Sequence, residues 1–240
     1  DANGWVMRMP AGLTGYATLL MTNMPPEATS LAGRYRLSYR GEGQIDLEGL
    51  PTRVQRRPGE ITFDYTPGEG TILMTVSATD PKGTGDYIRD ISVVKEDERA
   101  AFDAGAVFNP AFIARMRGVA GVRFMDWMAT NASPIETWEQ RPKPGDVTAA
   151  RAGTPAEAMV DLATTLDADP WFTMPHKADD GYFRAFATLV RDRLDPSRKA
   201  YVEYSNEVWN WAFPQADWAR QEAIARWGAN APEDAFLQFE

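Results

Sequence analysis

The sequence contains no cysteine and only one histidine, His176, among its 240 residues. Without thiols the chain can form neither a disulfide framework nor a thiolate metal site, and a cysteine nucleophile is excluded. A single histidine is also too few for a conventional zinc site. We therefore expect no metal centre, and nothing in the sequence calls for a cofactor.

Long apolar runs and an excess of basic charge are missing as well. No stretch approaches the roughly 18 apolar residues of a membrane-spanning helix. The chain has 25 Lys and Arg against 34 Asp and Glu, a formal net charge of −9, which disfavours binding to nucleic acid or to an anionic membrane. It begins at Asp1 without a recognisable signal peptide.

Aromatic residues, by contrast, are abundant, and eight of them are tryptophan. Tryptophan is costly to leave exposed, so it lies either in a core or on a flat apolar platform of the kind that binds sugar rings. Composition alone does not choose between these two roles.

Residues 16–94 have the pattern of short strands. Tyr35, Leu37 and Tyr39, for example, alternate with arginine and serine, which gives one apolar and one polar face. Turn residues such as those at 67–70 separate the runs. Several short strands at close spacing predict an antiparallel β-sandwich domain over residues 1–98.

Residues 99–240 alternate between strands and helices. Apolar strands are predicted at 122–127, 170–175 and 201–205, and helices begin near Pro110, at a capping box over 154–157, at an Asp179 cap and near Pro214. This alternation builds a parallel sheet, and no Gly-rich phosphate loop follows any strand. Polar and aromatic residues follow each strand instead, which is typical of a (β/α)8 barrel.

The third of these strands ends in the most informative residues. Asn206 and Glu207 come directly after it, and Trp209 lies just beyond. A general acid for glycoside cleavage needs partial desolvation to raise its pKa, and also a neighbour that orients the sugar and an aromatic ring for stacking. These residues supply all three. The simpler interpretation is a surface-loop acid beside core tryptophans.

Four further residues at the strand ends are candidate substrate contacts: Asp126, Trp127, Asn131 and His176. Asp126 could instead pair with Arg123, and His176 could be a hydrogen-bonded structural residue. Glu203 shares the strand parity of Glu207 and is a candidate for a hydrogen-bonded acid inside the barrel.

The stretches 122–128, 170–176 and 201–210 resemble the clan A glycoside hydrolases. Within that clan they are most similar to bacterial cellulase-like hydrolases, often labelled cellulose-binding, which carry a β-domain inside the barrel. The resemblance implies that the three strands are strands 2–4 of a TIM (β/α)8 barrel, which is incomplete in this chain. It also implies that Glu207 is the acid/base and that Asn206 holds the hydroxyl next to the reacting carbon.

Enzymes of this clan are retaining, so a second carboxylate is expected about 5 Å away as nucleophile. In the family it is a glutamate ending the seventh strand, which lies outside this chain. We therefore expect an interior piece of a longer protein, with the missing half of its own barrel and a β-linked polysaccharide or oligosaccharide as partners. Such a substrate implies an extracellular, cell-surface or periplasmic location. The alternative is a non-catalytic carbohydrate-binding protein with a degenerate barrel.

Overall fold

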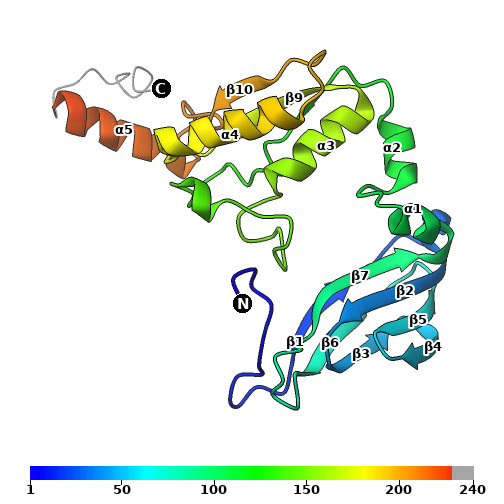
Figure 1. The fold of residues 1–240 in the computed structure, drawn as a ribbon. Helices are drawn as coiled ribbons and strands as arrows, with labels where there is room; N and C mark the ends of the chain where they lie inside the picture. The colour runs from blue at the N-terminus through cyan, green and yellow to red at the C-terminus, as the bar shows by residue number, and fades with distance from the viewer. Residues whose placement is uncertain (229–240) are drawn as a thin grey trace. The chain divides into compact units, whose positions relative to one another are not determined.

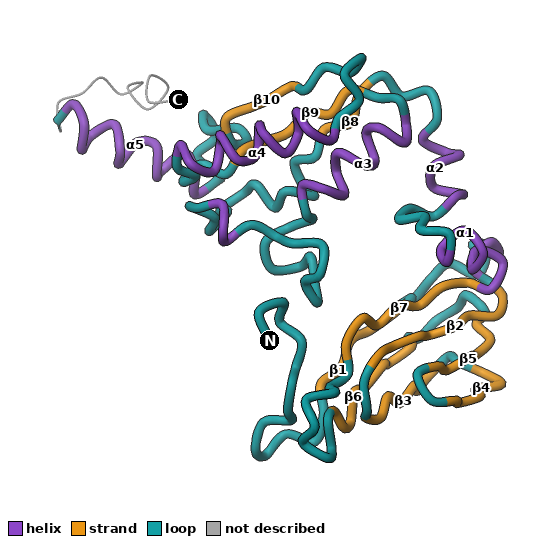
Figure 2. The backbone as a smooth tube through the Cα atoms, viewed as in Figure 1, coloured by secondary structure: helices purple, strands orange, loops and turns teal. Residues whose placement is uncertain are grey.

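The computed structural model describes residues 1–228. The chain is mixed α/β, with two antiparallel sheets and a small parallel sheet. It divides into two compact units, Asp1–Pro110 and Ala111–Glu240, whose elements are drawn in Figures 1 and 2. The boundary between the units comes after the short helix α1 (Arg99–Asp103) rather than before it.

The strands of the first unit form two antiparallel sheets. The three-stranded sheet has the order β1-β6-β3 and contains β1 (Tyr16–Leu20), β6 (Ile72–Thr79) and β3 (Gly43–Gly49). The four-stranded sheet has the order β4-β5-β2-β7 and contains β4 (Thr52–Arg57), β5 (Glu60–Tyr65), β2 (Gly33–Arg40) and β7 (Arg89–Lys95).

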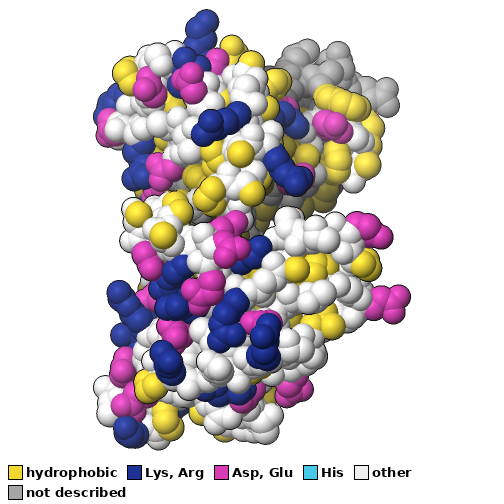
Figure 3. Space-filling model, turned by 90° about the vertical axis from the view of Figure 1, so that its right-hand side faces the viewer, with side chains coloured by type: hydrophobic (Ala, Val, Ile, Leu, Met, Phe, Trp, Pro, Cys, Tyr) yellow, Lys and Arg dark blue, Asp and Glu magenta, His cyan; other side chains and the backbone are white. Residues whose placement is uncertain are grey.

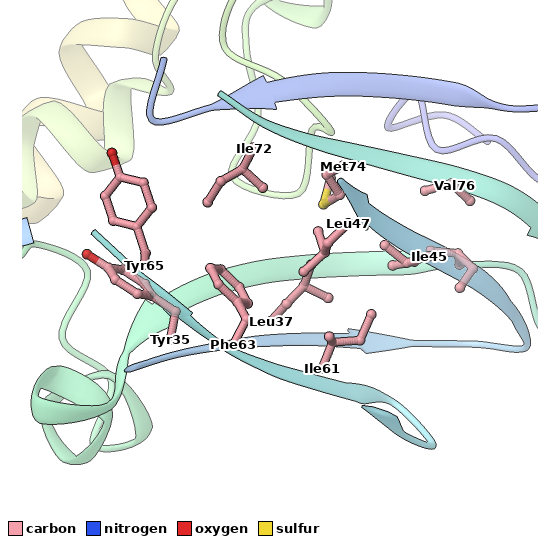
Figure 4. Close-up of a cluster of buried hydrophobic side chains, with 11 residues drawn as sticks. Tyr35, Leu37, Ile45, Leu47, Ile61, Phe63, Tyr65, Ile72, Met74 and Val76 are labelled. Atoms are coloured by element: carbon pink, nitrogen blue, oxygen red, sulfur yellow. The ribbon is translucent and has the colours of Figure 1, made fainter. Parts of the chain in front are cut away.

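Both sheets turn their apolar faces into one shared core. Leu37 and Phe63 from the four-stranded sheet and Ile72 from the three-stranded sheet are completely buried, and Figure 4 shows side chains of the two sheets pointing toward one another. Each such side chain contributes about 1.5–3 kcal/mol through removal from water. The period-two alternation predicted for these strands is therefore confirmed, since the core positions are every second residue.

Short helical segments lie between β1 and β2 and between β7 and β8. They are the 3-10 turns η1 (Thr29–Leu31) and η2 (Glu96–Glu98), and then the helices α1 and α2 (Pro110–Met116).

The second unit contains a parallel sheet of order β10-β9-β8, formed by β8 (Gly121–Arg123), β9 (Asp169–Met174) and β10 (Tyr201–Tyr204). Helix α3 (Ala156–Leu166) connects β8 to β9, α4 (Asp180–Arg193) connects β9 to β10, and α5 (Pro214–Trp227) follows β10. The predicted alternation of parallel strands and helices is confirmed. The 3-10 turn η3 (Trp138–Gln140) lies in the long loop before α3.

Helices α3 and α4 lie side by side on one face of this sheet (Figure 1). The buried ring of Phe172 in β9 is 4.9 Å from the ring of Phe186 in α4 and 5.7 Å from the ring of Phe124, measured between centroids. Because side chains alternate along a strand, Arg123, Trp171 and Glu203 face the opposite side. That opposite side carries the polar residues of the candidate site.

Two local predictions at helix starts have different outcomes. Asp179 caps α4 as predicted, since its Oδ1 accepts a hydrogen bond from the backbone N–H of Tyr182 at 2.7 Å. The capping box at 154–157 is wrong, because Pro155 is the N-cap of α3 and makes no side-chain cap bond. The backbone N–H of Thr154 donates to the carbonyl of Trp127 at 2.6 Å, which holds this residue outside the helix.

Strand β8 is shorter than the predicted run to Trp127. The backbone N–H of Met128 donates to the carbonyl of Phe124 at 2.8 Å, so the chain turns directly after the strand. None of the helices within residues 1–228 is long and apolar enough to cross a membrane.

Candidate active site

The backbone at the end of β10 adopts an unusual conformation. Ser205 has φ of 56° and Glu207 has φ of 46°, in the left-handed region that residues other than glycine rarely adopt and that costs about 1–3 kcal/mol at each position. The strand ends at Tyr204, and the extended alternation does not continue beyond it. The shared parity inferred for Glu203 and Glu207 therefore does not apply, because Glu207 lies in a turn.

Asn206 lies between these two strained residues, and its side chain is 3% exposed. Its amide oxygen Oδ1 accepts a hydrogen bond from Nη2 of Arg123 at 2.8 Å. Its nitrogen Nδ2 donates to Oδ1 of Asn131 at 3.0 Å. Because a guanidinium has donors only, the oxygen of the amide must be the atom that faces Arg123, which fixes the orientation of the group.

Gln215, in the first turn of α5, completes this network and was not expected from the sequence. It is fully buried, and its Nε2 donates to Oδ1 of Asn131 and to the backbone carbonyl of Asn206, both at 2.7 Å. Its Oε1 accepts from the backbone N–H of Ala132 at 3.1 Å, which fixes the orientation of this amide too. Nothing in the local sequence distinguishes Gln215 from a surface glutamine in the first turn of a helix.

Arg123 is held in turn by Glu203. Its guanidinium makes a two-pronged ion pair with that carboxylate, Nε to Oε2 at 3.0 Å and Nη2 to Oε1 at 2.9 Å. The pairing of Arg123 with Asp126, open at the level of sequence, is therefore wrong. The reason is the sheet register, which aligns Arg123 and Tyr201 with Trp171 and so brings Glu203, two residues after Tyr201, onto the same face as Arg123.

Glu207 is half-buried, directly beside this network. Its Oε2 accepts a hydrogen bond from Nδ2 of Asn210 at 2.8 Å, and its backbone carbonyl accepts from the N–H of the same residue at 2.8 Å. Just beyond the turn, Trp209 is 61% exposed and Trp211 is 56% exposed. Two large aromatic surfaces thus lie next to the carboxylate in the sequence and face solvent.

His176, at the end of β9, is buried. Its ring lies edge-on to the ring of Trp218, 5.2 Å between centroids, and its backbone carbonyl accepts a hydrogen bond from the Tyr204 hydroxyl at 2.7 Å. The ring nitrogen Nδ1 has no hydrogen-bond partner within the part of the chain that the structure describes. Burial, assisted by the neighbouring charge of Lys177, lowers the pKa of His176 to about 4, so the imidazole is neutral at pH 7.

The remaining predicted site residues divide into two groups. Asn131 joins the network at its centre, as the acceptor for both Asn206 and Gln215. Trp127 is half-buried and packs against Phe124, 5.6 Å between ring centroids. Among residues 1–228, no hydrogen bond joins Trp127 or the exposed Asp126 to Asn206 or Glu207. The same residues contain no group of three His, Asp or Glu side chains that could hold a metal ion.

Comparison with known proteins adds no relative: no protein-family model, no curated protein and no solved structure matches this chain. The function has to be inferred from the geometry of the site.

Proposed function

We propose that this chain is part of a glycoside hydrolase that cleaves a β-linked polysaccharide or oligosaccharide by a retaining mechanism, with Glu207 as general acid/base. The observation that carries the proposal is the fixed amide of Asn206 directly beside Glu207. Two chains of hydrogen bonds hold this amide in a single orientation. One runs from Glu203 through Arg123, and the other runs from Ala132 through Gln215 and Asn131.

Such an arrangement suits recognition of a sugar hydroxyl. One N–H of the Asn206 amide bonds to Asn131, and the second N–H is the proposed donor to the hydroxyl next to the reacting carbon. A donor held by its neighbours needs little further ordering when the substrate binds, so its bond can strengthen as charge develops at that carbon.

Glu207 then gives its proton to the leaving oxygen and later removes a proton from the attacking water. Asn210 donates to one carboxylate oxygen, Oε2, which supports the other oxygen as the one that exchanges the proton. The retaining mechanism needs a second carboxylate about 5 Å away as nucleophile, and by this proposal it comes from outside this chain. Trp209 supplies a stacking surface, while His176, Trp127 and Asp126 remain predicted contacts.

The same proposal also assigns a specific fold to each of the two units. The antiparallel sheets with their common core are the inserted β-sandwich, and β8, β9 and β10 are strands 2–4 of a TIM barrel. Among residues 1–228, strand β10 is an edge strand of its sheet. An apolar groove of about 440 Å³ runs between it and α4, lined by Phe172, Phe183, Val190, Leu194 and Val202 among others. A further strand and helix of the barrel would cover this groove. A polysaccharide substrate would make the protein extracellular, cell-surface or periplasmic.

The acid/base role is tested with Glu207→Gln in the full-length protein. On a panel of unactivated β-glucans we expect kcat/KM to fall about 10²–10⁴-fold, because the leaving oxygen is no longer protonated. On an aryl glycoside with a good leaving group the first step needs little protonation, so its loss should be much smaller, and added azide should restore turnover by replacing the water that Glu207 activates. Glu139→Gln, at an exposed position of η3, serves as the matched control.

Equal activity of the wild type and Glu207→Gln would end the acid/base assignment. Binding of a β-glucan by the wild type without turnover would favour the alternative of a carbohydrate-binding protein with a degenerate barrel. The exposed faces of Trp209 and Trp211 are compatible with such binding.

A further inference from the structure

The four-stranded sheet of the first unit is basic, although the chain as a whole is acidic. Its strands β2, β4, β5 and β7 hold eight of the 25 Lys and Arg residues but only three of the 34 Asp and Glu. The strands of the other sheet hold no Lys or Arg. Figure 3 shows Lys and Arg side chains gathered, with acidic side chains among them, at the height at which Figure 1 draws these strands.

One end of this sheet is hollowed. The hollow has a volume of about 360 Å³, and its lining includes Arg34, Arg53 and Asp64 together with the hydroxyl-bearing residues Thr52 and Thr66. The volume is within the range of small-molecule sites. All these residues belong to the first unit, whereas the residues of the candidate active site belong to the second.

The two arginines share a single acid. Nη1 of Arg34 donates to Oδ1 of Asp64 at 3.0 Å, and Nη2 of Arg53 pairs with the other oxygen of the same carboxylate. Arg34 is held further by Thr62 at 2.8 Å and Gln55 at 3.3 Å. Two guanidiniums and one carboxylate leave one unit of positive charge at the hollow.

The backbone contributes to this arrangement. The pairing of β4 with β5 shifts register between Thr52 and Gln55, and Arg53, inside the irregularity, has φ of 48°. Left-handed backbone at a non-glycine residue costs free energy, and bulges of this kind redirect a side chain. The Arg53 side chain remains 79% exposed while its tip reaches Asp64. Its donors are therefore accessible to a ligand in the hollow.

We propose that this hollow binds the carboxylate of an acidic saccharide, such as a uronic acid unit in a polysaccharide. Guanidinium groups match a planar carboxylate with two parallel hydrogen bonds, and the net charge of the hollow matches one monoanion. Asp64 then accepts hydrogen bonds from sugar hydroxyls, to which Thr52 and Thr66 can also bond. Inorganic phosphate suits the site less well, because its higher charge lies against the carboxylate of Asp64.

The test is calorimetric titration of the full chain at low ionic strength with three probes: trigalacturonate, the neutral galactotriose and inorganic phosphate. We expect trigalacturonate to bind with submillimolar Kd and the other two to bind at least ten-fold more weakly. Arg53→Gln should weaken trigalacturonate binding at least ten-fold. Because Arg53 is largely exposed, this variant should fold normally, which circular dichroism checks.

Arg57→Gln is the matched control, since Arg57 is an exposed arginine at the end of the same strand, outside the hollow. It should change the Kd less than three-fold. An equal loss in both variants would mean diffuse attraction to the basic sheet and would overturn the site. Phosphate binding as tight as trigalacturonate binding, or no binding of trigalacturonate, would overturn it as well. None of these outcomes bears on Glu207, so the proposed hydrolase activity stands or falls separately.

Discussion

At the scale of single residues, His176 couples folding to pH. Burial lowers its pKa to about 4 in the folded chain, whereas the unfolded chain keeps a value near 6.5. Between these two values the unfolded state binds more protons, so the stabilising contribution is complete above about pH 6.5 and is lost as the pH falls toward 4. The neutral ring can pack edge-on against Trp218, but the protonated ring would be a buried charge with no partner for Nδ1 among residues 1–228.

We therefore expect the free energy of unfolding of the second unit to decrease by about 2 kcal/mol between pH 7 and pH 5. His176→Phe, which keeps an aromatic ring against Trp218, should remove most of this difference. Urea unfolding at the two pH values measures it, with tryptophan fluorescence as the signal, because seven of the eight tryptophans belong to this unit. A pH difference of the same size in the variant would show that other groups cause it.

The residues of the candidate site differ in how far sequence could predict them. Asn206 and Glu207 are adjacent in the chain and follow a recognisable strand. To predict that they lie together, it was enough to locate the end of that strand. The pair of Arg123 and Glu203 depends on the relative register of two strands that are 80 residues apart, and no local pattern specifies that register. Gln215 depends on the direction in which α5 leaves the turn, and this too is a tertiary property.

At the scale of secondary-structure elements, the N-terminus of α4 gives a paired test. Asp179 caps the helix through the Tyr182 N–H, whereas its neighbour Asp180 makes only an exposed ion pair with Arg184. We expect Asp179→Ala to destabilise the second unit by about 1 kcal/mol and Asp180→Ala by less than about 0.5 kcal/mol. Urea unfolding followed by tryptophan fluorescence compares the two variants. The cap assignment would be refuted by an effect of Asp180→Ala as large as that of Asp179→Ala.

The elements themselves were predictable where one face is buried and the other is not. The alternation in β2, β5 and β6 meets this condition, and so do the long amphipathic helices. Strand β4 has a single inward apolar residue, Val54, among arginines and polar residues, so its pattern gave no signal. Strand β4 forms because it pairs with the edge of β5. Sequence periodicity gives no information about such pairing.

At the scale of the whole molecule, one edge of β10 pairs with no other strand among residues 1–228. This edge distinguishes the proposed partial barrel from a sheet that is complete in itself. Val202 is 61% exposed and lines the apolar groove beside α4. A parallel sheet ordinarily has both faces covered and its strands read as apolar runs, because it lies inside the protein. In the proposed barrel a further strand and helix lie beside β10, and they would bury this exposed valine.

The substitution Val202→Asp distinguishes the two cases. In the 240-residue chain the new carboxylate remains in water, so the free energy of unfolding should change by less than about 0.5 kcal/mol. If the proposed barrel covers β10 in a longer protein, the same carboxylate would be buried there without a partner, and we expect a loss of at least about 3 kcal/mol. Phe172→Ala, at a position completely buried within this chain, should cost about 3–5 kcal/mol in both proteins and shows that each measurement responds to core damage. A small effect of Val202→Asp in both proteins would mean that nothing covers β10, and the barrel would have to be abandoned together with the second carboxylate that it is proposed to supply.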